Sequence, residues 1–204
     1  MHEFGSEGAK KTGRTTIRRL RTEFVDDAEP QQRMLADLGE METMIRATLA
    51  FAKEEADPEP RQSVDLVSLL QSVCQDWPEA TLTLADEPRR LAYLCQPVAV
   101  RRGLTNLVAN AVKYGDRARV TLAQTAADIV IAVDDDGPGI PEDEMENVFR
   151  PLYRVEQWRS RDTGGTGLGL SVARAVFRAH GGDVTLANRA EGGLRATVTL
   201  PRQE

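Results

Sequence analysis

The sequence has 204 residues, of which 41% are hydrophobic and 28% are charged, and its formal net charge is −6. This composition suits one globular domain of about 150 residues with a smaller element beside it. The negative charge argues against nucleic acid as a partner of the whole surface. The two cysteines lack metal-ligand spacing, and without a visible secretory signal they fit a reducing compartment.

No membrane-spanning segment is expected in this chain. The longest mostly apolar run, residues 91–100, is interrupted by Gln96 and Pro97, and it is half the length of about 20 residues that a spanning helix needs. We therefore predict a cytoplasmic location, which is compatible with a parent protein anchored in the inner membrane.

The N-terminal part is predicted to be a helical hairpin. Residues 1–12 are interpreted as a tag and linker, because MHEFGS matches what common cloning sites encode. Residues 13–56 contain two helical patterns, and the second carries a near-heptad apolar seam along 31–55. A seam of this kind needs a partner, so we predict a homodimer in which two hairpins form a four-helix bundle. The alternative is that the hairpin packs against the larger domain of its own chain.

Residues 57–204 are predicted to form an α+β domain, a two-layer sandwich in which a mixed sheet is covered by about three helices. Helices are predicted at 65–77, 97–115 and 171–182. Strands are predicted at 81–85, 91–95, 119–125, 128–135, 183–189 and 194–201. The long polar segment 141–163 is typical of a mobile lid.

The helix predicted at 97–115 has two unlike faces. Its apolar side carries Leu104, Leu107, Val108, Ala111 and Val112. The nearly opposite side carries Asn106, Asn110, Lys113 and Tyr114. Asn is a poor helix former, so this side favours a ligand-binding face over an ordinary solvated one. An Asn carbonyl oxygen is a hard, neutral ligand that suits Mg²⁺, and Lys113 adds a cation.

Three consecutive acids end the strand predicted at 128–135. Strand alternation places Asp135 in the apolar row with Ile129, Ile131 and Val133. It places Asp134 and Asp136 on the other side, where we expect them to be structural or solvated acids. The glycines and the proline at 137–139 allow the backbone to turn and to approach a ligand closely. The pattern leaves open a ligand contact and a turn with solvated acids.

A third pattern, GGTGLGL at 164–170, stands directly before the helix predicted from Ser171. Its glycines expose backbone N–H groups at a helix N-terminus, which favours anions and phosphate in particular. It is neither a Rossmann fingerprint nor a P-loop, because the spacing differs and no Lys-Ser/Thr follows. A flexible hinge is the alternative.

Together these segments resemble the catalytic, ATP-binding domain of sensor histidine kinases, a branch of the superfamily that also holds gyrase, heat-shock chaperones and MutL. NLVANAVKYG resembles the asparagine box of that family, VDDDGPGIP its first glycine box, VFRPLYR its phenylalanine box and GTGLGL its second glycine box. The four occur in family order. The hairpin at 13–55 resembles the family's dimerisation hairpin.

The resemblance implies ATP and Mg²⁺ as cofactors. The residues that it assigns to ATP are Asn106, Asn110, Lys113, Tyr114, Asp135, Gly137, Gly139, Ile140, Tyr153, Arg154, Gly165, Thr166, Gly167, Leu168 and Gly169. Asn110 would ligate the Mg²⁺ that bridges the phosphates, and Asp135 would accept a hydrogen bond from the adenine amino group. A carboxylate at that place would repel guanine, which presents an acceptor oxygen there.

The histidines depart from the family pattern, in which the first hairpin helix carries a phosphate-accepting His. His2 lies in the tag-like MHEFGS, and His180 is predicted to cap the last helix. We therefore expect the acceptor to lie upstream of this sequence or to have been replaced. The chain as given is then expected to bind ATP without phosphorylating its own hairpin.

The resemblance implies a histidine protein kinase that transfers the γ-phosphoryl group of ATP to a histidine. From there the group would pass to an aspartate in the receiver domain of a response regulator. Because the acceptor His is missing, an ATP-binding regulatory module or an anti-sigma-type serine kinase of the same superfamily stays open as the alternative.

Overall fold

The computed structural model of the chain describes residues 38–39, 59–85, 90–155 and 166–203. The chain divides into two compact units, Met1–Ala52 and Lys53–Glu204. Of the first unit only Leu38 and Gly39 are described, and both are helical. The predicted tag, the hairpin with its dimeric bundle and the domain boundary near residue 56 therefore lie outside the described residues.

The second unit is built on a five-stranded sheet with the order β2-β4-β5-β7-β6. Its strands are β2 (Ala80–Leu84), β4 (Ala118–Gln124), β5 (Asp128–Asp134), β6 (Asp183–Asn188) and β7 (Leu194–Pro201). β2 runs parallel to β4, and the other neighbours are antiparallel. β1 (Gln62–Asp65) and β3 (Ala92–Cys95) form a separate antiparallel pair.

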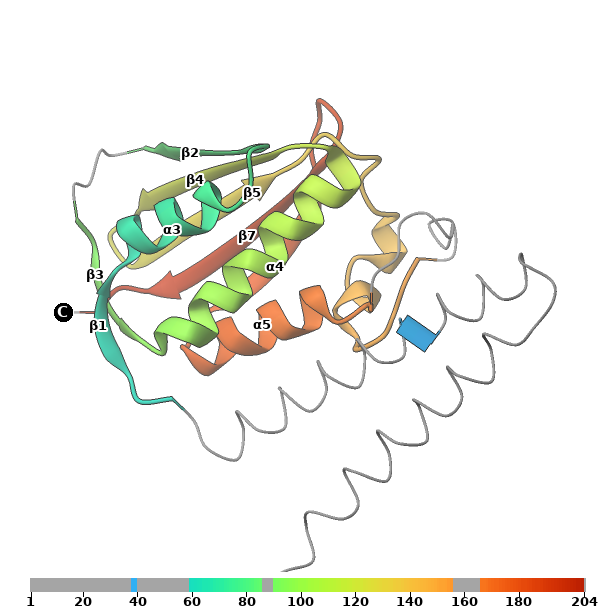
Figure 1. Cartoon of the computed structure of the whole chain (residues 1–204). Coiled ribbons are helices and arrows are strands. Elements are labelled where there is room, and N and C mark those ends of the chain that lie inside the picture. Colours follow the sequence, from blue (N-terminus) through green and yellow to red (C-terminus); the bar gives the residue numbers. More distant parts are fainter. Residues whose placement is uncertain (1–37, 40–58, 86–89, 156–165, 204) are drawn as a thin grey trace, which may run out of the picture. The chain divides into compact units, whose positions relative to one another are not determined.

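Three helices cover one face of the five-stranded sheet (Figure 1). They are α3 (Leu66–Gln75), α4 (Pro97–Gly115) and α5 (Gly169–Ala179). α3 contacts β2, α4 contacts β4 and β5, and α5 contacts β6 and β7. Two single 3₁₀ turns, η1 (Glu142–Glu144) and η2 (Asn147–Phe149), precede α5. The predicted two-layer α+β sandwich with a mixed sheet is thus confirmed.

The core lies between the helices and the sheet. Ile129, Ile131 and Val133 alternate along β5 and are buried in one apolar cluster with Leu104 and Leu107 of α4. Burying a side chain of this size stabilises the fold by about 1.5–3 kcal/mol relative to exposing it. Among the described residues, no helix has the length and apolar character that crossing a membrane requires.

Two local differences from the sequence prediction have physical causes. β1 was not predicted, because its four residues contain a single large apolar side chain and its strand conformation depends on pairing with β3. α5 begins at Gly169, two residues before the predicted start at Ser171. The last glycine of GTGLGL therefore belongs to the first helical turn and not to the loop.

His180 ties α5 to the beginning of α4. It is the C-cap of α5, as predicted, and is 5% exposed. Its Nε2 accepts a hydrogen bond from the backbone N–H of Gln96, the N-cap of α4, at 3.0 Å. Because a backbone N–H can only donate, the ring proton sits on Nδ1, which donates to the carbonyl of Val176 at 2.7 Å.

We expect His180→Phe to lower the free energy of unfolding by about 1–3 kcal/mol, because the Gln96 N–H and the Val176 carbonyl would lose their partners in a largely buried place. Urea denaturation followed by circular dichroism measures the change. A variant within about 0.5 kcal/mol of the wild type would show that the ring contributes volume only.

Candidate functional site

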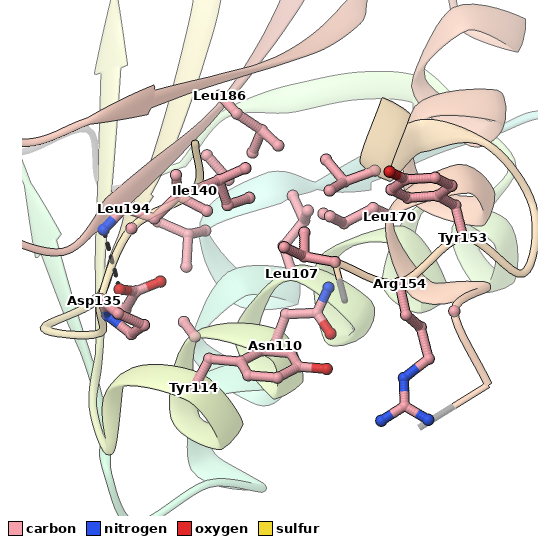
Figure 2. Close-up of a pocket in the computed structure, with 18 residues that line it drawn as sticks. Leu107, Asn110, Tyr114, Asp135, Ile140, Tyr153, Arg154, Leu170, Leu186 and Leu194 are labelled. Carbon is pink, nitrogen blue, oxygen red and sulfur yellow. Dashed lines mark hydrogen bonds between the residues drawn. The ribbon is translucent and has the colours of Figure 1, made fainter. Parts of the chain in front are cut away.

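A pocket opens between α4, the start of α5, the end of β5 and the start of β7 (Figure 2). Its empty space, including the open mouth, is about 860 Å³. Most of its wall is apolar: Leu107, Ala111, Val133, Pro138, Ile140, Val148, Val155, Leu170, Leu186, Leu194 and Ala196. The polar side chains on the wall are Asn110, Tyr114, Asp135, Tyr153 and Arg154. An apolar cavity with a few polar groups is typical of a site for a small organic ligand.

Asp135 presents an oriented carboxylate to this pocket. The residue is 7% exposed. Its Oδ1 accepts two backbone hydrogen bonds, from the N–H of Gly137 at 2.8 Å and from the N–H of Leu194 at 2.9 Å. The described residues donate no hydrogen bond to Oδ2. The side chain is thus held by one oxygen and offers the other to a ligand that carries a donor N–H.

Two glycines let three segments meet at Asp135. A Cβ atom on Gly137 would lie 2.5 Å from the carbonyl oxygen of Tyr114 at the end of α4. A Cβ atom on Gly193, where φ is +89°, would lie 2.0 Å from the carbonyl oxygen of Asp135. Any larger residue would push the end of α4 or the β6–β7 turn away from the carboxylate.

The other end of the loop 135–140 is held by Asn188 at the end of β6. Its side-chain Oδ1 accepts from the backbone N–H of Ile140 at 2.8 Å, and its Nδ2 donates to the carbonyl of the same residue at 2.7 Å. This two-way amide pairing fixes Ile140 in the apolar wall of the pocket.

The polar end of the pocket lies where α4 passes the start of α5. The side-chain amide of Asn110 is so close to Gly169 that a Cβ there would lie 3.4 Å from Asn110 Nδ2. Backbone N–H groups at a helix start favour anions, and an amide oxygen suits a hard cation. No cluster of His, Cys, Asp or Glu in the described part of the chain could hold a metal by itself. A cation here would therefore need ligand oxygens from a bound substrate in addition to Asn110.

Residues 141–155, the described part of the segment before α5, are held by contacts with α5 and with the residues just before it. The ring of Phe149 in η2 lies 4.2 Å from the guanidinium carbon of Arg174 in α5. The Leu152 N–H donates to the carbonyl of Gly167 at 3.0 Å, and the Tyr153 hydroxyl donates to Glu144. Residues 141–155 of the predicted lid thus contain turns packed against α5, and residues 156–165 lie outside the description.

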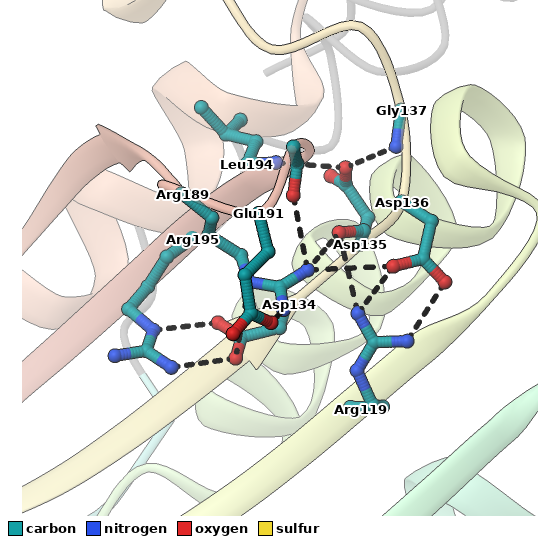
Figure 3. A network of polar contacts seen from close by, with 10 residues as sticks. Arg119, Asp134, Asp135, Asp136, Gly137, Arg189, Glu191, Leu194 and Arg195 are labelled. Atoms are coloured by element: carbon teal, nitrogen blue, oxygen red, sulfur yellow. Dashed lines mark hydrogen bonds and ion pairs between the residues drawn. The ribbon is translucent and has the colours of Figure 1, made fainter.

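The two acids beside Asp135 are bound by arginines (Figure 3). Asp134 is 8% exposed, and both of its oxygens accept from Arg195 of β7 at 2.6 Å. Asp136 accepts from Arg119 of β4 at 2.5 and 2.8 Å. The hydrogen bonds from these arginines lower the pKa of Asp134 and lower that of Asp136 to about 2.

Strand alternation predicts that Asp134 and Asp136 lie away from the buried row as structural or solvated acids. A structural role is what the ion pairs give them. Solvation is wrong for Asp134, because the strand ends against β7 and Arg195 covers the carboxylate from that neighbouring strand.

Comparison with known families identifies the domain. The family described as "Histidine kinase-, DNA gyrase B-, and HSP90-like ATPase" matches residues 95–204, which is more than half of the chain. The chain belongs to this ATPase family. Its second unit is an ATP-binding catalytic domain of the histidine-kinase type, so the resemblance carried by the four sequence boxes is confirmed.

Relatives of this ATPase domain are sensor kinases. The chain is 40% identical over 188 residues to the sensor histidine kinase GtrS of Pseudomonas aeruginosa, which covers 90% of this chain and 38% of the relative. It is 38% identical over 122 residues to the sensor histidine kinase CpxA of Escherichia coli, covering 59% of this chain and 27% of the relative. The chain spans less than half the length of the curated relatives it matches.

Among solved structures, the ATP-binding domain of PrrB from Mycobacterium tuberculosis resembles this ATPase domain. The TM-score is 0.57 at 28% identity, and the match covers 72% of this chain and all of the other.

The structure brings together part of the predicted ATP-binding set. Eight of its residues line the pocket: Asn110, Tyr114, Asp135, Gly139, Ile140, Tyr153, Arg154 and Gly167. Six are described but lie outside the lining: Asn106, Lys113, Gly137, Thr166, Leu168 and Gly169. Lys113 instead has its Nζ 5.0 Å from the centre of the Tyr114 ring. Gly165 and His2 lie outside the described residues.

Sequence reasoning missed most of the apolar wall. Leu107 and Ala111 were assigned to the helix face that packs on the core, yet both also border the pocket. Leu186, Leu194 and Ala196 come from the last hairpin, which carried no motif. Their alternation along the strands indicated burial, but it did not distinguish a core from a ligand-lined cavity.

We expect Arg195→Met to lower the free energy of unfolding at pH 7 by about 1–3 kcal/mol, because Asp134 loses the guanidinium that faces it. The wild type should lose stability as the pH falls below about 4. The pKa of Asp134 is below its ordinary value of 3.8 in the folded protein, so the unfolded chain takes up the proton first. In the variant this acid-dependent loss should shrink. Urea titrations at pH 7, 5, 4 and 3 measure both effects, and equal pH slopes would contradict the assignment.

Proposed function

We propose that the chain is the ATP-binding kinase core of a two-component sensor histidine kinase. The observation that carries the proposal is the carboxylate of Asp135, which is fixed by two backbone N–H groups at the end of an apolar pocket. Membership of the ATPase family and kinship with sensor kinases support it.

The apolar part of the pocket suits the adenine base. Leu107 comes from α4 and Ile140 from the loop after β5, and both offer apolar surface for a flat aromatic ring. The 6-amino group of adenine would donate to Asp135 Oδ2. Guanine would bring a carbonyl oxygen to the same place, where a carboxylate repels it. The carboxylate therefore selects the base as well as binding it.

The triphosphate would extend from the base toward Asn110 and the start of α5. Backbone N–H groups from Gly165 to Gly169 and the guanidinium of Arg154 would bind the phosphates, with Lys113 and Asn106 on the same side of α4. The Asn110 side-chain oxygen would ligate one Mg²⁺, whose remaining ligands would be phosphate oxygens and water. The ion would neutralise the charge that develops during phosphoryl transfer.

In the transfer itself, an imidazole nitrogen of the acceptor histidine would attack the γ-phosphorus. The bond to the bridging oxygen would break, ADP would leave, and the imidazole would lose its proton. His180 is unsuited to this role, because both ring nitrogens are hydrogen-bonded inside the domain. We infer that the acceptor histidine is supplied from outside this sequence, in a parent protein that is a homodimer. The phosphohistidine would then pass its phosphoryl group to an aspartate of a response regulator.

Asp135→Asn should reverse the preference of the pocket between bases. The two N–H donors would hold the amide oxygen, so the new NH₂ group would face the base and oppose the amino group of adenine. We expect the affinity for ATP to fall about tenfold or more and the affinity for GTP to rise relative to ATP. Isothermal titration calorimetry with Mg²⁺ and each nucleotide measures the ratio.

Asp136→Asn is the matched control for this experiment, since Asp136 is bound by Arg119 and does not line the pocket. It should keep the wild-type preference for ATP. Tight ATP binding that is the same in the wild type and in Asp135→Asn would refute the assignment of the base site.

Asn110→Ala should remove the Mg²⁺-dependent part of ATP binding. We expect wild-type affinity to rise when Mg²⁺ replaces EDTA, and we expect this gain to fall at least threefold in the variant, because one protein oxygen is lost from the ion. Asn110→Asp, which keeps an oxygen at the same place, is the control. An unchanged Mg²⁺ gain in Asn110→Ala would place the ion elsewhere.

A further inference from the structure

Arg189, the first residue after β6, touches all three acids of the run 134–136. Its Nη1 donates to the backbone carbonyl of Asp135 at 2.8 Å and lies 3.3 Å from Asp136 Oδ1, and its Nε lies 3.8 Å from Asp134 Oδ2. Its side chain is 18% exposed, against 38% for Arg119 and 50% for Arg195. The least exposed arginine of the network is thus the one directed at the base-reading residue (Figure 3).

Arg189 also builds the turn that supplies one of the two donors to the carboxylate. Its backbone N–H donates to the carbonyl of Gly193 at 3.0 Å, and its Nη1 lies 3.2 Å from the carbonyl oxygen of Gly192. The next residue, Leu194, donates its N–H to Asp135 Oδ1. One side chain therefore fixes the main chain of Asp135 and the turn that orients its carboxylate.

Charge gives the same guanidinium a second effect. Three consecutive carboxylates repel one another, and cations placed beside them offset this repulsion. Arg195 binds the carboxylate of Asp134, and Arg119 binds that of Asp136. Arg119 also contacts the Asp135 carbonyl, at the longer distance of 3.4 Å. Arg189 contacts the carboxylates of Asp134 and Asp136 and the backbone carbonyl of Asp135, and it leaves the Asp135 Oδ2 unoccupied.

We propose that Arg189 is a positioning residue for base recognition, acting through Asp135 to set the preference for a nucleobase that carries an amino group. The inference rests on the proposed function, since it takes the pocket to be an adenine site. It adds a residue outside the four boxes that holds the main chain of Asp135 and the turn leading to Leu194, one of the two donors to the carboxylate. The far end of the loop is held independently by Asn188, so replacing Arg189 leaves Ile140 anchored.

The test compares two nucleotides that differ by one group, ATP and purine riboside triphosphate, which lacks the 6-amino group. Titration calorimetry with Mg²⁺ gives both dissociation constants for the wild type and for Arg189→Met. We expect the wild type to prefer ATP by about tenfold or more, as is typical of a hydrogen bond to a charged acceptor. The preference should fall at least threefold in Arg189→Met, with little change for the purine nucleotide.

Arg195→Met is the matched control, because it removes an arginine from the same network without touching the Asp135 carbonyl. It should lose stability and keep the wild-type preference. If the preference for ATP over the purine nucleotide falls equally in both variants, the cause is a general loss of order in residues 134–136, and the proposal is overturned. An Arg189→Met variant that binds both nucleotides more weakly by the same factor also overturns it.

Thermal denaturation establishes that each variant is folded. If Arg189→Met does not fold, Arg189→Lys decides, because it keeps the charge but not the planar fork. A wild-type preference in folded Arg189→Lys overturns the proposal, and a reduced preference supports it. A wild type that binds no ATP overturns the proposed function and this inference with it, whereas an ATP-preferring wild type with an equally selective Arg189→Met overturns the inference alone.

Discussion

The site depends on one interaction: a carboxylate oxygen of Asp135 that accepts hydrogen bonds from two backbone N–H groups belonging to different segments. Gly137 donates from the loop that follows β5, and Leu194 donates from the start of β7. Side-chain donors could turn away, whereas these backbone donors are held by the course of the main chain. The second oxygen is therefore fixed in direction before any ligand arrives, and fixing groups in advance reduces the free energy lost on binding.

The surroundings of this carboxylate follow from the need to keep three segments together. Gly193 lets the turn lie against the Asp135 carbonyl, and Gly137 lets the loop lie against the end of α4. Arginines from β4, from β7 and from the turn directly after β6 neutralise the neighbouring acids. Without these cations, the repulsion among three adjacent carboxylates would not be offset in the fold. The surroundings of Asp135 thus depend on the sheet as much as on the local segment VDDDGPGIP.

The sequence was a good guide wherever a pattern was local. The helix 97–115 has the predicted bounds, and the alternation along β5 correctly placed Asp135 on the buried row with Ile131. Contacts between residues far apart in the chain could not be predicted from the sequence. Nothing near Arg189 or Asn188 indicates that they hold a loop some 50 residues away. The burial of Asp134 was missed for the same reason, since its partner Arg195 is brought beside it by strand pairing alone.

The bond between His180 and Gln96 has a dynamic consequence for the two helices beside the pocket. It joins the end of α5 to the start of α4, whereas the start of α5 meets α4 at Asn110, about 20 Å along the helix axis. The end of α5 is thus held against the start of α4 by a hydrogen bond. The start of α5 is Gly169, and glycine loses more backbone entropy on ordering than any other residue. Amide hydrogen exchange should be graded along α5: its last turn opens with the core, and its first turn opens locally. A ligand held at that first turn would slow exchange where the helix is loosest.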